Sequence, residues 1–327
     1  MLGEFELIRR FSPRFLADLP EGVRGIGDDC AVIERGDGTA LLVTTDLLVE
    51  GTHFLFDRIS AEDLGWKSLA VSLSDIAAMG GTPHSAYLSL ALSPRTDVAW
   101  ADRFFEGFGD LAERTETLLL GGDTVRSPSG VVVNVAVLGS ARAACVKLRS
   151  AARPGDAVCV TGDLGDSAAG LRSILEGSAE GEDVRELAER HRRPRPHLEE
   201  GRWLGALPEV RAMIDVSDGI DSDLRRIVES SSAGAEVDLE RLPTSAALRR
   251  ACERRGWRAE ELAAAGGEDY CLLLTVDPAA FELAAREFEA RFGRPLARIG
   301  TIVEEGFRYL RGGRPAAIEA RGFDHFR

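Results

Sequence analysis

The stretch PGDAVCVTGDLGDSAAGLRSILEG, residues 154–177, predicts a turn, a short apolar strand and a helix in immediate succession. Pro-Gly-Asp is a turn signal, AVCVTG suits a buried strand, and the residues after it have helical spacing. The same order recurs further on, where a strand over Ala212–Val216 leads through SDG into a helical segment and another strand is expected over Tyr270–Val276. Strands that alternate with helices indicate an α/β or mixed α+β architecture and exclude a β-sandwich.

The residues before this stretch predict a second unit of the same kind. Strands rich in β-branched residues are expected over Ala40–Thr45 and Gly130–Gly139, with a long helix over Ala61–Ala78 between them. A length of 327 residues suits two domains, and we place them at 1–148 and 149–327. The segment 177–196, which contains HRRPRP, is expected to form a loop and a solvated surface helix, although its arginines could instead clamp a phosphate.

Composition narrows the classes of function. The chain has 40 lysines and arginines against 54 aspartates and glutamates, a net charge of −14, which argues against a nucleic-acid partner because such proteins need a basic patch. No apolar stretch is long enough to span a bilayer and the first residues lack the order of a signal peptide, so we expect a cytoplasmic protein without a membrane partner. The five scattered cysteines lack CxxC spacing and are expected to be small buried residues.

Lysine is almost absent, since Lys67 and Lys147 are the only two in the sequence. Neither follows glycine, so the chain has no Gly-Lys-[Ser/Thr] phosphate loop. The kinase HRD and DFG motifs, the GxSxG elbow and HExxH are also missing from the sequence. GFGDLA at residues 107–112 fits a dinucleotide-loop pattern formally, but it lies in a helical stretch, so we expect no such loop there.

The informative pattern is an aspartate at an expected strand end or in a glycine turn. It occurs as GIGDD (25–29), TTD (44–46), LSD (73–75), GGD (121–123) and DVSDG (215–219). Asp75 also closes an apolar helical face, where an unpaired charge would be costly. Converging carboxylates repel one another and raise their own pKa values, so such a cluster needs cations. Hard oxygen ligands favour Mg²⁺, which binds carboxylates together with substrate phosphates.

Each motif also has a plainer explanation. A Gly-Asp pair is commonly just a turn, the threonines of TTD could simply finish a strand, and Ser217 or Asp218 could cap the following helix. His53 in EGTHF could be a satisfied surface residue, and GGED at 266–269 could be a polar turn. TGDLGDSAAG could bring N–H groups to a phosphate or merely connect a strand tightly to a helix.

Together the motifs carry a resemblance to a known family. In order along the chain, the matching segments are GEFELI (3–8), GIGDDCAV (25–32), TTDLLVEGTHF (44–54), KSLAVSLSDIAAMGG (67–81), LGGDTVR (120–126), RPGDAVCVTGDLGDSAAGL (153–171), IDVSDGIDSDL (214–224), AGGEDY (265–270) and GFDHF (322–326). The sequence resembles the thiamine-monophosphate kinases, members of the superfamily built like aminoimidazole ribonucleotide synthetase. The resemblance implies a two-domain mixed α/β fold, with N-terminal domains that pair in a homodimer and a C-terminal α/β domain that completes the active-site cleft.

The resemblance also implies the activity and its residues. The expected reaction moves the γ-phosphoryl group of ATP to thiamine monophosphate, with several Mg²⁺ ions and with K⁺ as a further candidate. The implied metal ligands are Asp29, Thr44, Thr45, Asp46, Asp75, Asp123, Asp215 and Asp218, of which Asp46, Asp123 and Asp218 are the expected catalytic residues. The implied ATP contacts are Gly122, Asp123, Arg149 and Ser217, and the implied contacts to thiamine phosphate are His53, Glu268 and Phe323.

Other members of the superfamily, and a different class of function, provide the alternatives. Selenophosphate synthetase would need a cysteine in a glycine-rich N-terminal segment, yet no cysteine precedes Cys30, and the chain ends GFDHFR without the C-terminal cysteine of the hydrogenase-maturation relatives. A non-catalytic metal-binding scaffold would use the same acidic turns without turnover. The kinase interpretation needs no lysine-based phosphate loop and no general base, because metal ions can hold the phosphates and the acceptor phosphate is already largely ionised at neutral pH.

Overall fold

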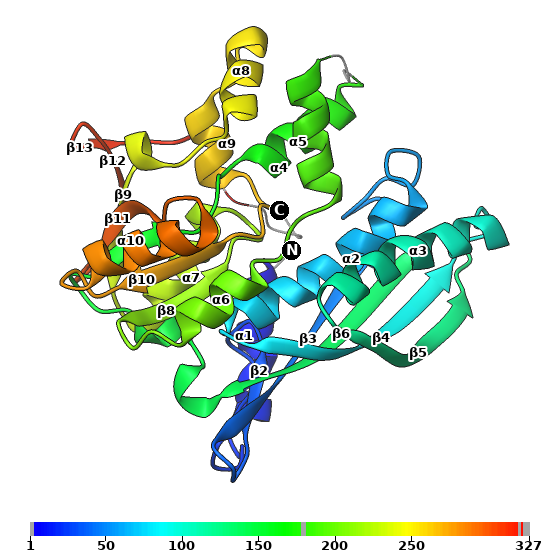
Figure 1. Ribbon diagram of the computed structural model, residues 1–327, viewed down its shortest axis with the longest axis horizontal. Coiled ribbons are helices and arrows are strands. Elements are labelled where there is room, and N and C mark those ends of the chain that lie inside the picture. The colour runs from blue at the N-terminus through cyan, green and yellow to red at the C-terminus, as the bar shows by residue number, and fades with distance from the viewer. Residues whose placement is uncertain (1–2, 178–180, 320–321, 323–327) are drawn as a thin grey trace.

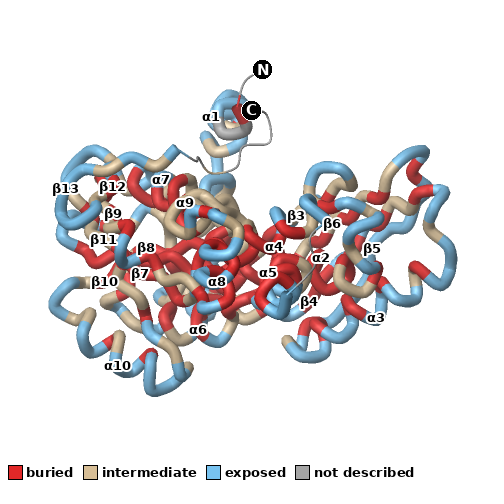
Figure 2. The backbone as a smooth tube through the Cα atoms, turned by 90° about the horizontal axis from the view of Figure 1, so that it is seen from above, coloured by how far each residue is buried: buried red, intermediate tan, exposed pale blue. Residues whose placement is uncertain are grey.

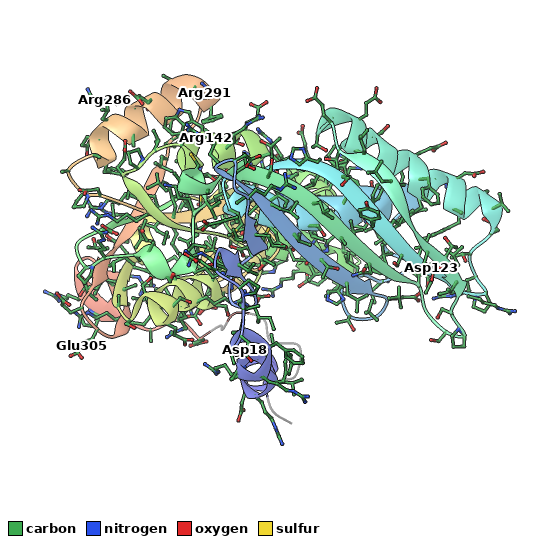
Figure 3. All side chains as sticks on the ribbon, turned by 90° about the horizontal axis from the view of Figure 1, so that it is seen from below. Asp18, Asp123, Arg142, Arg286, Arg291 and Glu305 are labelled. Carbon is green, nitrogen blue, oxygen red and sulfur yellow. The ribbon has the colours of Figure 1, made fainter. Side chains whose placement is uncertain are left out.

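The computed structural model describes residues 3–177, 181–319 and 322, which form two halves that each contain a mixed sheet (Figure 1). Helix α1 (Glu4–Leu16) precedes both sheets and projects from the rest of the molecule, close to the label of Asp18 in Figure 3. Figure 2 shows the halves side by side, with buried backbone running across the zone where they meet. The expected mixture of strands and helices is confirmed, whereas the division at residue 148 stays a prediction.

The first half holds a six-stranded sheet in the order β1-β2-β3-β6-β4-β5, within the described residues. Its neighbouring strands are antiparallel except for the parallel pair β4 and β5. The long β3–β6 ladder puts Asp46 opposite Val135. The strands are β1 (Val23–Arg24), β2 (Ala31–Glu34), β3 (Thr39–Val49), β4 (Thr82–Leu92), β5 (Leu118–Arg126) and β6 (Val132–Arg142).

Helix α2 (Ala61–Ala78), which has the bounds expected from the sequence, is the central helix of the molecule. The Ser60 hydroxyl caps it by accepting a hydrogen bond from the Asp63 N–H at 3.0 Å. It is buried on nearly every side, between the first sheet, α3 (Val98–Arg114) and α6 (Leu198–Gly205). Glycines permit this close packing, because a Cβ on Gly107 of α3 would lie 1.8 Å from the Glu62 carbonyl oxygen. GFGDLA is therefore a helix-packing segment of α3 and not a dinucleotide loop.

The second half holds a seven-stranded sheet in the order β13-β12-β9-β11-β7-β10-β8, again within the described residues. Its strands are β7 (Ala157–Val160), β8 (Val210–Asp215), β9 (Gly234–Asp238), β10 (Leu272–Val276), β11 (Ala297–Val303), β12 (Phe307–Arg311) and β13 (Arg314–Ala316). Both faces of β7 are buried, because Val158 and Val160 pack on the side of Ile220 and Leu224 whereas Ala157 and Cys159 pack on the side of Leu204 and Phe288. That burial explains the unbroken apolar run AVCV.

Helices cover both faces of this second sheet (Figure 1). On one face lie α6 and α10 (Phe281–Phe292), and on the other lie α7 (Ile220–Ser231) and α9 (Ala259–Ala265). Helices α4 (Asp166–Leu175), α5 (Glu182–Arg192) and α8 (Ala246–Arg255) pack together in a separate cluster, and short 3₁₀ turns occur at Ala143–Cys145, Arg149–Ala151 and Leu239–Arg241. Four cysteines are buried as expected, whereas Cys145 is half-buried, and all five are free thiols. Among the described residues, no helix is long and apolar enough to cross a membrane, and the cytoplasmic location stays a prediction.

The expectation that the aspartates sit at strand ends or in glycine turns is wrong for three motifs. Asp46 lies inside β3, Asp123 lies inside β5, and Asp75 lies in the last turn of α2. Backbone pairing continues past Asp46 and Asp123, which face Val135 and Ser89 on the neighbouring strands. The expectation holds for GIGDD, which is irregular, and for Asp215, which ends β8.

The segment that contains HRRPRP is more firmly held than a solvated surface helix. Arg193 forms ion pairs with Glu62 and Asp63 on α2, and the Trp66 indole N–H donates to the Pro194 carbonyl at 2.9 Å. Helix α5 forms as expected, but its residue His191 is buried. The arginine-clamp alternative is not supported for Arg193, because its guanidinium is held by two carboxylates.

Replacing Gly107 by alanine should lower the free energy of unfolding by about 1–3 kcal/mol, because the added Cβ would collide with the backbone of α2. Gly109 is the matched control on the same helix, since a Cβ there meets nothing within 4 Å. Gly109→Ala should stabilise the protein by about 0.5–1 kcal/mol through helix propensity. Urea unfolding of both variants measures the contrast, and equal stabilities would contradict the close α2–α3 packing.

Candidate active site

A cavity of about 730 Å³ lies where the two halves meet, and it gathers most of the residues expected from the sequence. Its walls come from β3, α2, α4, the end of α5 and the loop that contains GGED. The expected residues that line it are Asp29, Thr44, Thr45, Asp46, His53, Asp75, Arg149, Asp215, Ser217, Asp218 and Glu268. Gly122 and Asp123 do not line it, and Phe323 lies outside the described residues.

The acidic end of the cavity is built from both halves of the chain. Carboxylate oxygens of Asp29, Asp75 and Asp215 lie within 4.8 Å of one another, and they come from the loop before β2, from α2 and from the end of β8. The Thr44 hydroxyl donates to Asp75. Asp46 accepts a hydrogen bond from the Ser72 hydroxyl at 2.7 Å. Strand β3 and helix α2 therefore fix Asp46 and Asp75 beside the carboxylates supplied by the other segments.

Burial and mutual repulsion of these carboxylates favour the binding of a cation. Burial, followed by repulsion from neighbouring carboxylates, raises the pKa of Asp75 and of Asp215 well above the ordinary value. The Oδ2 atoms of Asp29 and Asp215 are buried and have no hydrogen-bond partner among the described residues. Buried carboxylate oxygens without donors are costly unless a cation binds them. This donor set therefore fits a hard divalent cation such as Mg²⁺.

Arg149 holds two aspartates at the edge of the acidic cluster. Arg149 forms an ion pair with Asp29, and its main-chain N–H donates to the Asp28 carboxylate at 3.2 Å. Burial, together with the neighbouring Asp29 charge, raises the pKa of Asp28 to about 7. Sequence reasoning gave Asp28 no role, although it stands beside Asp29 in the GIGDD motif.

The loop that carries Ser217 and Asp218 is held from the first turns of α7. The Asp223 carboxylate accepts hydrogen bonds from the N–H groups of Ser217 and Asp218, both at 3.1 Å, and Arg226 forms an ion pair with Asp218. Helix α7 itself begins after Gly219 without a side-chain cap, so the expectation that Ser217 or Asp218 could cap it is wrong. Asp223 and Arg226 were missed because they lie in an ordinary helical pattern.

The opposite end of the cavity centres on Glu268. The Lys67 ammonium lies 3.0 Å from one carboxylate oxygen of Glu268 and 3.1 Å from the other, and His191 Nδ1 lies 3.2 Å from Oε2. Burial alone would raise the pKa of Glu268, but interactions led by the charge of Lys67 outweigh burial and lower that pKa. Burial, together with Lys67, lowers the pKa of His191 to about 3, so its imidazole is neutral. From the sequence, Lys67 served only to exclude a phosphate loop.

Helix α2 sets the distance between the two ends. Lys67, Val71 and Asp75 are spaced four residues apart, so they lie on one face of the helix, and all three line the cavity. At 1.5 Å per residue, the backbone positions of Lys67 and Asp75 are about 12 Å apart. The cavity can therefore take a small molecule with an anionic phosphate at one end and a group attracted to a carboxylate at the other.

Two of the expected residues have other partners in the cavity wall. The His53 ring accepts a hydrogen bond from the Val49 N–H at 2.9 Å through Nδ1, which fixes the ring in the turn after β3. The Thr45 hydroxyl accepts from the Asn134 side-chain amide at 2.8 Å, and Thr45 is exposed. Thr44 thus joins the acidic cluster through its side chain, whereas the Thr45 hydroxyl is engaged on a different residue.

Gly122 and Asp123 lie on the exposed edge strand of the first sheet, where Figure 3 labels Asp123 far from the second half. Strands β6 and β4 separate β5 from β3, so Asp46 and Asp123 are about 14 Å apart across the sheet. Gly122 has φ +151°, and a Cβ there would lie 1.7 Å from the Leu88 carbonyl oxygen. Only glycine fits against β4 at this position.

Similarity to known proteins identifies the family. The family models described as AIR synthase related protein, N-terminal domain, and AIR synthase related protein, C-terminal domain, match residues 27–141 and 153–311. The chain thus belongs, with its fold, to the AIR synthase related proteins. This confirms the fold class expected from the sequence.

Individual relatives within that family give a more specific assignment than the family models do. The chain is 40% identical to the thiamine-monophosphate kinase of Escherichia coli strain K12, over 99% of this chain and 98% of that protein. It is 36% identical to the Bacillus subtilis strain 168 enzyme of the same name over 100% of both. A solved structure, AaThiL complexed with AMPPCP and TMP, has a TM-score of 0.86 at 34% identity and covers 99% of this chain and 97% of that one. The chain belongs to the thiamine-monophosphate kinases.

Millimolar Mg²⁺ should raise the melting temperature of the protein, and more at pH 8 than at pH 5. In metal-free protein, the raised pKa values of Asp75, of Asp215 and of Asp28, which is raised to about 7, give stability that is complete below pH ~4 and lost as the pH rises through ~7 and above. A bound cation should offset that loss. Differential scanning fluorimetry with EDTA or Mg²⁺ measures the shift.

Asp215→Asn should abolish most of this Mg²⁺ response, because it removes one carboxylate of the cluster. Asp37→Asn, in the exposed turn between β2 and β3, is the control and should respond as the wild type does. An unchanged Mg²⁺ response in Asp215→Asn would show that the cation binds elsewhere.

Proposed function

We propose that this chain transfers the γ-phosphoryl group of ATP directly and in line to thiamine monophosphate, giving thiamine diphosphate and ADP, with several Mg²⁺ ions held by its aspartates. The convergence of Asp29, Asp75 and Asp215 within 4.8 Å, in a cavity whose other end carries Glu268, is the observation that carries this proposal. The relatives named as thiamine-monophosphate kinases, and the AaThiL structure with AMPPCP and TMP, support the choice of substrates.

The two ends of the cavity suit the two chemical characters of the acceptor. Thiamine monophosphate carries a phosphate at one end and a cationic thiazolium with an aminopyrimidine at the other. We assign the aspartates, Arg149, Ser217 and Gly122 of β5 to the phosphates of ATP and the acceptor. His53, Glu268 and Phe323 are assigned to the thiamine group, for which the ionised Glu268 supplies a complementary charge.

The proposed reaction requires the chain to position the phosphates and to neutralise their charge, and it requires no proton transfer by a side chain. The second pKa of a phosphate monoester is about 6, so the attacking oxygen is already largely ionised at neutral pH. Bound Mg²⁺ would supply charge neutralisation and alignment of the phosphates. Each aspartate of the site is held by the chain itself. Arg149 pairs with Asp29, and the hydroxyls of Ser72 and Thr44 donate to Asp46 and Asp75. The end of β8 fixes Asp215. Residues of the chain therefore act by holding fixed negative charge where cations are needed.

A homodimer would complete the site. Strand β5 is exposed along its whole length, and the apolar side chains of Leu118, Leu120 and Val125 on it are exposed by 62%, 59% and 52%. An exposed apolar edge strand is a surface that proteins normally cover. A second copy placed against it would carry Gly122 and Asp123 to the cavity of its partner, which explains how these residues act although they lie away from the cavity of their own chain.

Purified protein with ATP, thiamine monophosphate, Mg²⁺ and K⁺ should form thiamine diphosphate and ADP. Chromatography of the products measures both. Folded, dimeric protein that forms no thiamine diphosphate would overturn the proposed function and would favour a non-catalytic metal-binding scaffold. Omitting K⁺ from the same assay tests whether the monovalent ion contributes.

Asp46→Asn and Asp123→Asn should each abolish turnover, and mixing the two variants tests whether Asp123 acts in the partner. If it does, a mixed dimer has one site with both defects and one site with neither. Unfolding and refolding an equal mixture should then restore about a quarter of wild-type activity, since about half of the dimers are mixed. If Asp123 acts within its own chain, the mixture stays inactive.

A further inference from the structure

Lys67 occupies an unusual place for a lysine in a chain that has only two. Its side chain is 1% exposed, yet it lies at the wall of the cavity. Helix α2 belongs to the first half of the chain and Glu268 to the second, so the Lys67–Glu268 ion pair crosses the junction between the halves. A buried ion pair is weak evidence for stability, because apolar residues of similar volume serve as well. Its position calls for another explanation.

The arrangement around Glu268 is directional. The Glu268 side chain is 26% exposed, whereas the side chains of Lys67 and His191 are 1% and 7% exposed. The two partners therefore sit behind the carboxylate, and the carboxylate faces the cavity. His191 is itself held, since its Nδ1 lies 2.9 Å from the Ser167 hydroxyl at the start of α4.

The backbone adds to this fixation. Glu268 has φ +63°, a left-handed conformation that is uncommon for a residue other than glycine. Its N–H donates to the Ser217 carbonyl at 2.8 Å, which ties the loop to the segment that carries Asp218. The next residue, Asp269, accepts hydrogen bonds from the N–H groups of Gly165 and Ser167 at 2.6 and 3.1 Å. The loop thus presents Glu268 at a fixed place and in a costly conformation.

We infer that Lys67 and His191 are positioning residues that hold the Glu268 carboxylate, across the junction of the two halves, in the orientation that recognises the cationic or amino-bearing part of the phosphate acceptor. This inference rests on the proposed function. The residues that anchor the end of α5 to α2, Arg193 and Pro194, keep His191 beside Lys67. A nucleotide triphosphate would be repelled by Glu268, so the three residues should affect binding of the acceptor and not of ATP.

Lys67→Met tests the inference through separate Michaelis constants for the two substrates. Loss of the ammonium should raise KM for thiamine monophosphate about tenfold or more, because an interaction that holds a charged group is lost. KM for ATP should stay within about twofold of wild type and kcat within about threefold. Calorimetric titration of each variant with thiamine monophosphate alone provides a second readout that does not depend on turnover.

A double-mutant cycle separates positioning from direct contact. If Lys67 acts through Glu268, Lys67→Met should add little to the KM defect of Glu268→Gln. The double variant also has no unpaired charge at the site, so it should fold even where Lys67→Met alone does not. His191→Asn, which keeps a donor near the place of Nδ1, should retain acceptor affinity that His191→Leu loses.

The second lysine provides the matched control. Lys147 is also buried, but it donates to the main-chain carbonyls of Leu207 and Val210 at 2.8 and 2.6 Å. Lys147→Met should lower the melting temperature and leave both Michaelis constants unchanged. The inference would be overturned if the effects of Lys67→Met and Glu268→Gln on KM for thiamine monophosphate were additive. It would also be overturned if Lys67→Met changed only KM for ATP or only kcat. In either case, turnover by the wild type would leave the proposed function unaffected. No wild-type turnover would instead overturn the proposed function.

Discussion

Repulsion among buried carboxylates is the constraint on which the site depends. Asp29, Asp75 and Asp215 come from three separated parts of the chain and meet within 4.8 Å. Like charges at that distance in a buried setting oppose folding unless protons or cations reduce them. The arginine beside Asp29 compensates for only part of the charge, and two carboxylate oxygens lack a donor in the part of the chain that the structure describes. A fold that tolerates this arrangement is built to be completed by cations, which is the chemical basis for a phosphate-transfer site without a lysine loop.

Helix α2 is the element that makes such a cluster possible. It is clamped by α3 through contacts at Gly65 and Gly107, where a Cβ would lie 2.0 and 1.8 Å from carbonyl oxygens, and by α6 through Gly201. The helix cannot shift to relieve the repulsion, because its neighbours pack against its backbone. Its free face then presents the acidic residue Asp75 two turns from Lys67. One rigid helix thereby relates the phosphate end of the cavity to the Glu268 end.

Local patterns predicted the elements far better than they predicted the surroundings of the aspartates. The bounds of α2 follow from its apolar spacing and its Ser60 cap, and β7 follows from an apolar run bounded by Pro154 and Gly155. By contrast, Asp46 and Asp123 were expected at strand ends or in glycine turns, but both lie inside long strands. A strand alternates its side chains between two faces, so an aspartate within it reaches a site as readily as one at its end. Only the pairing of the sheet reveals which face is involved.

The sequence by itself determined the mixed α/β class, the acidic motifs and, through their order, the resemblance to the thiamine-monophosphate kinases, because turn chemistry and residue type are local properties. Most of the site residues that it indicated line the cavity. Only the tertiary structure decided that Lys67 and His191 meet Glu268, that Asp223 holds the loop at Ser217, and that Asp123 lies on an edge strand outside the cavity of its own chain. The first depends on contacts between residues that are distant in the chain, the second on how a loop folds back on the helix after it, and the third on the position of a strand in its sheet. Spacing along the sequence does not specify these arrangements, since they arise only when the chain folds.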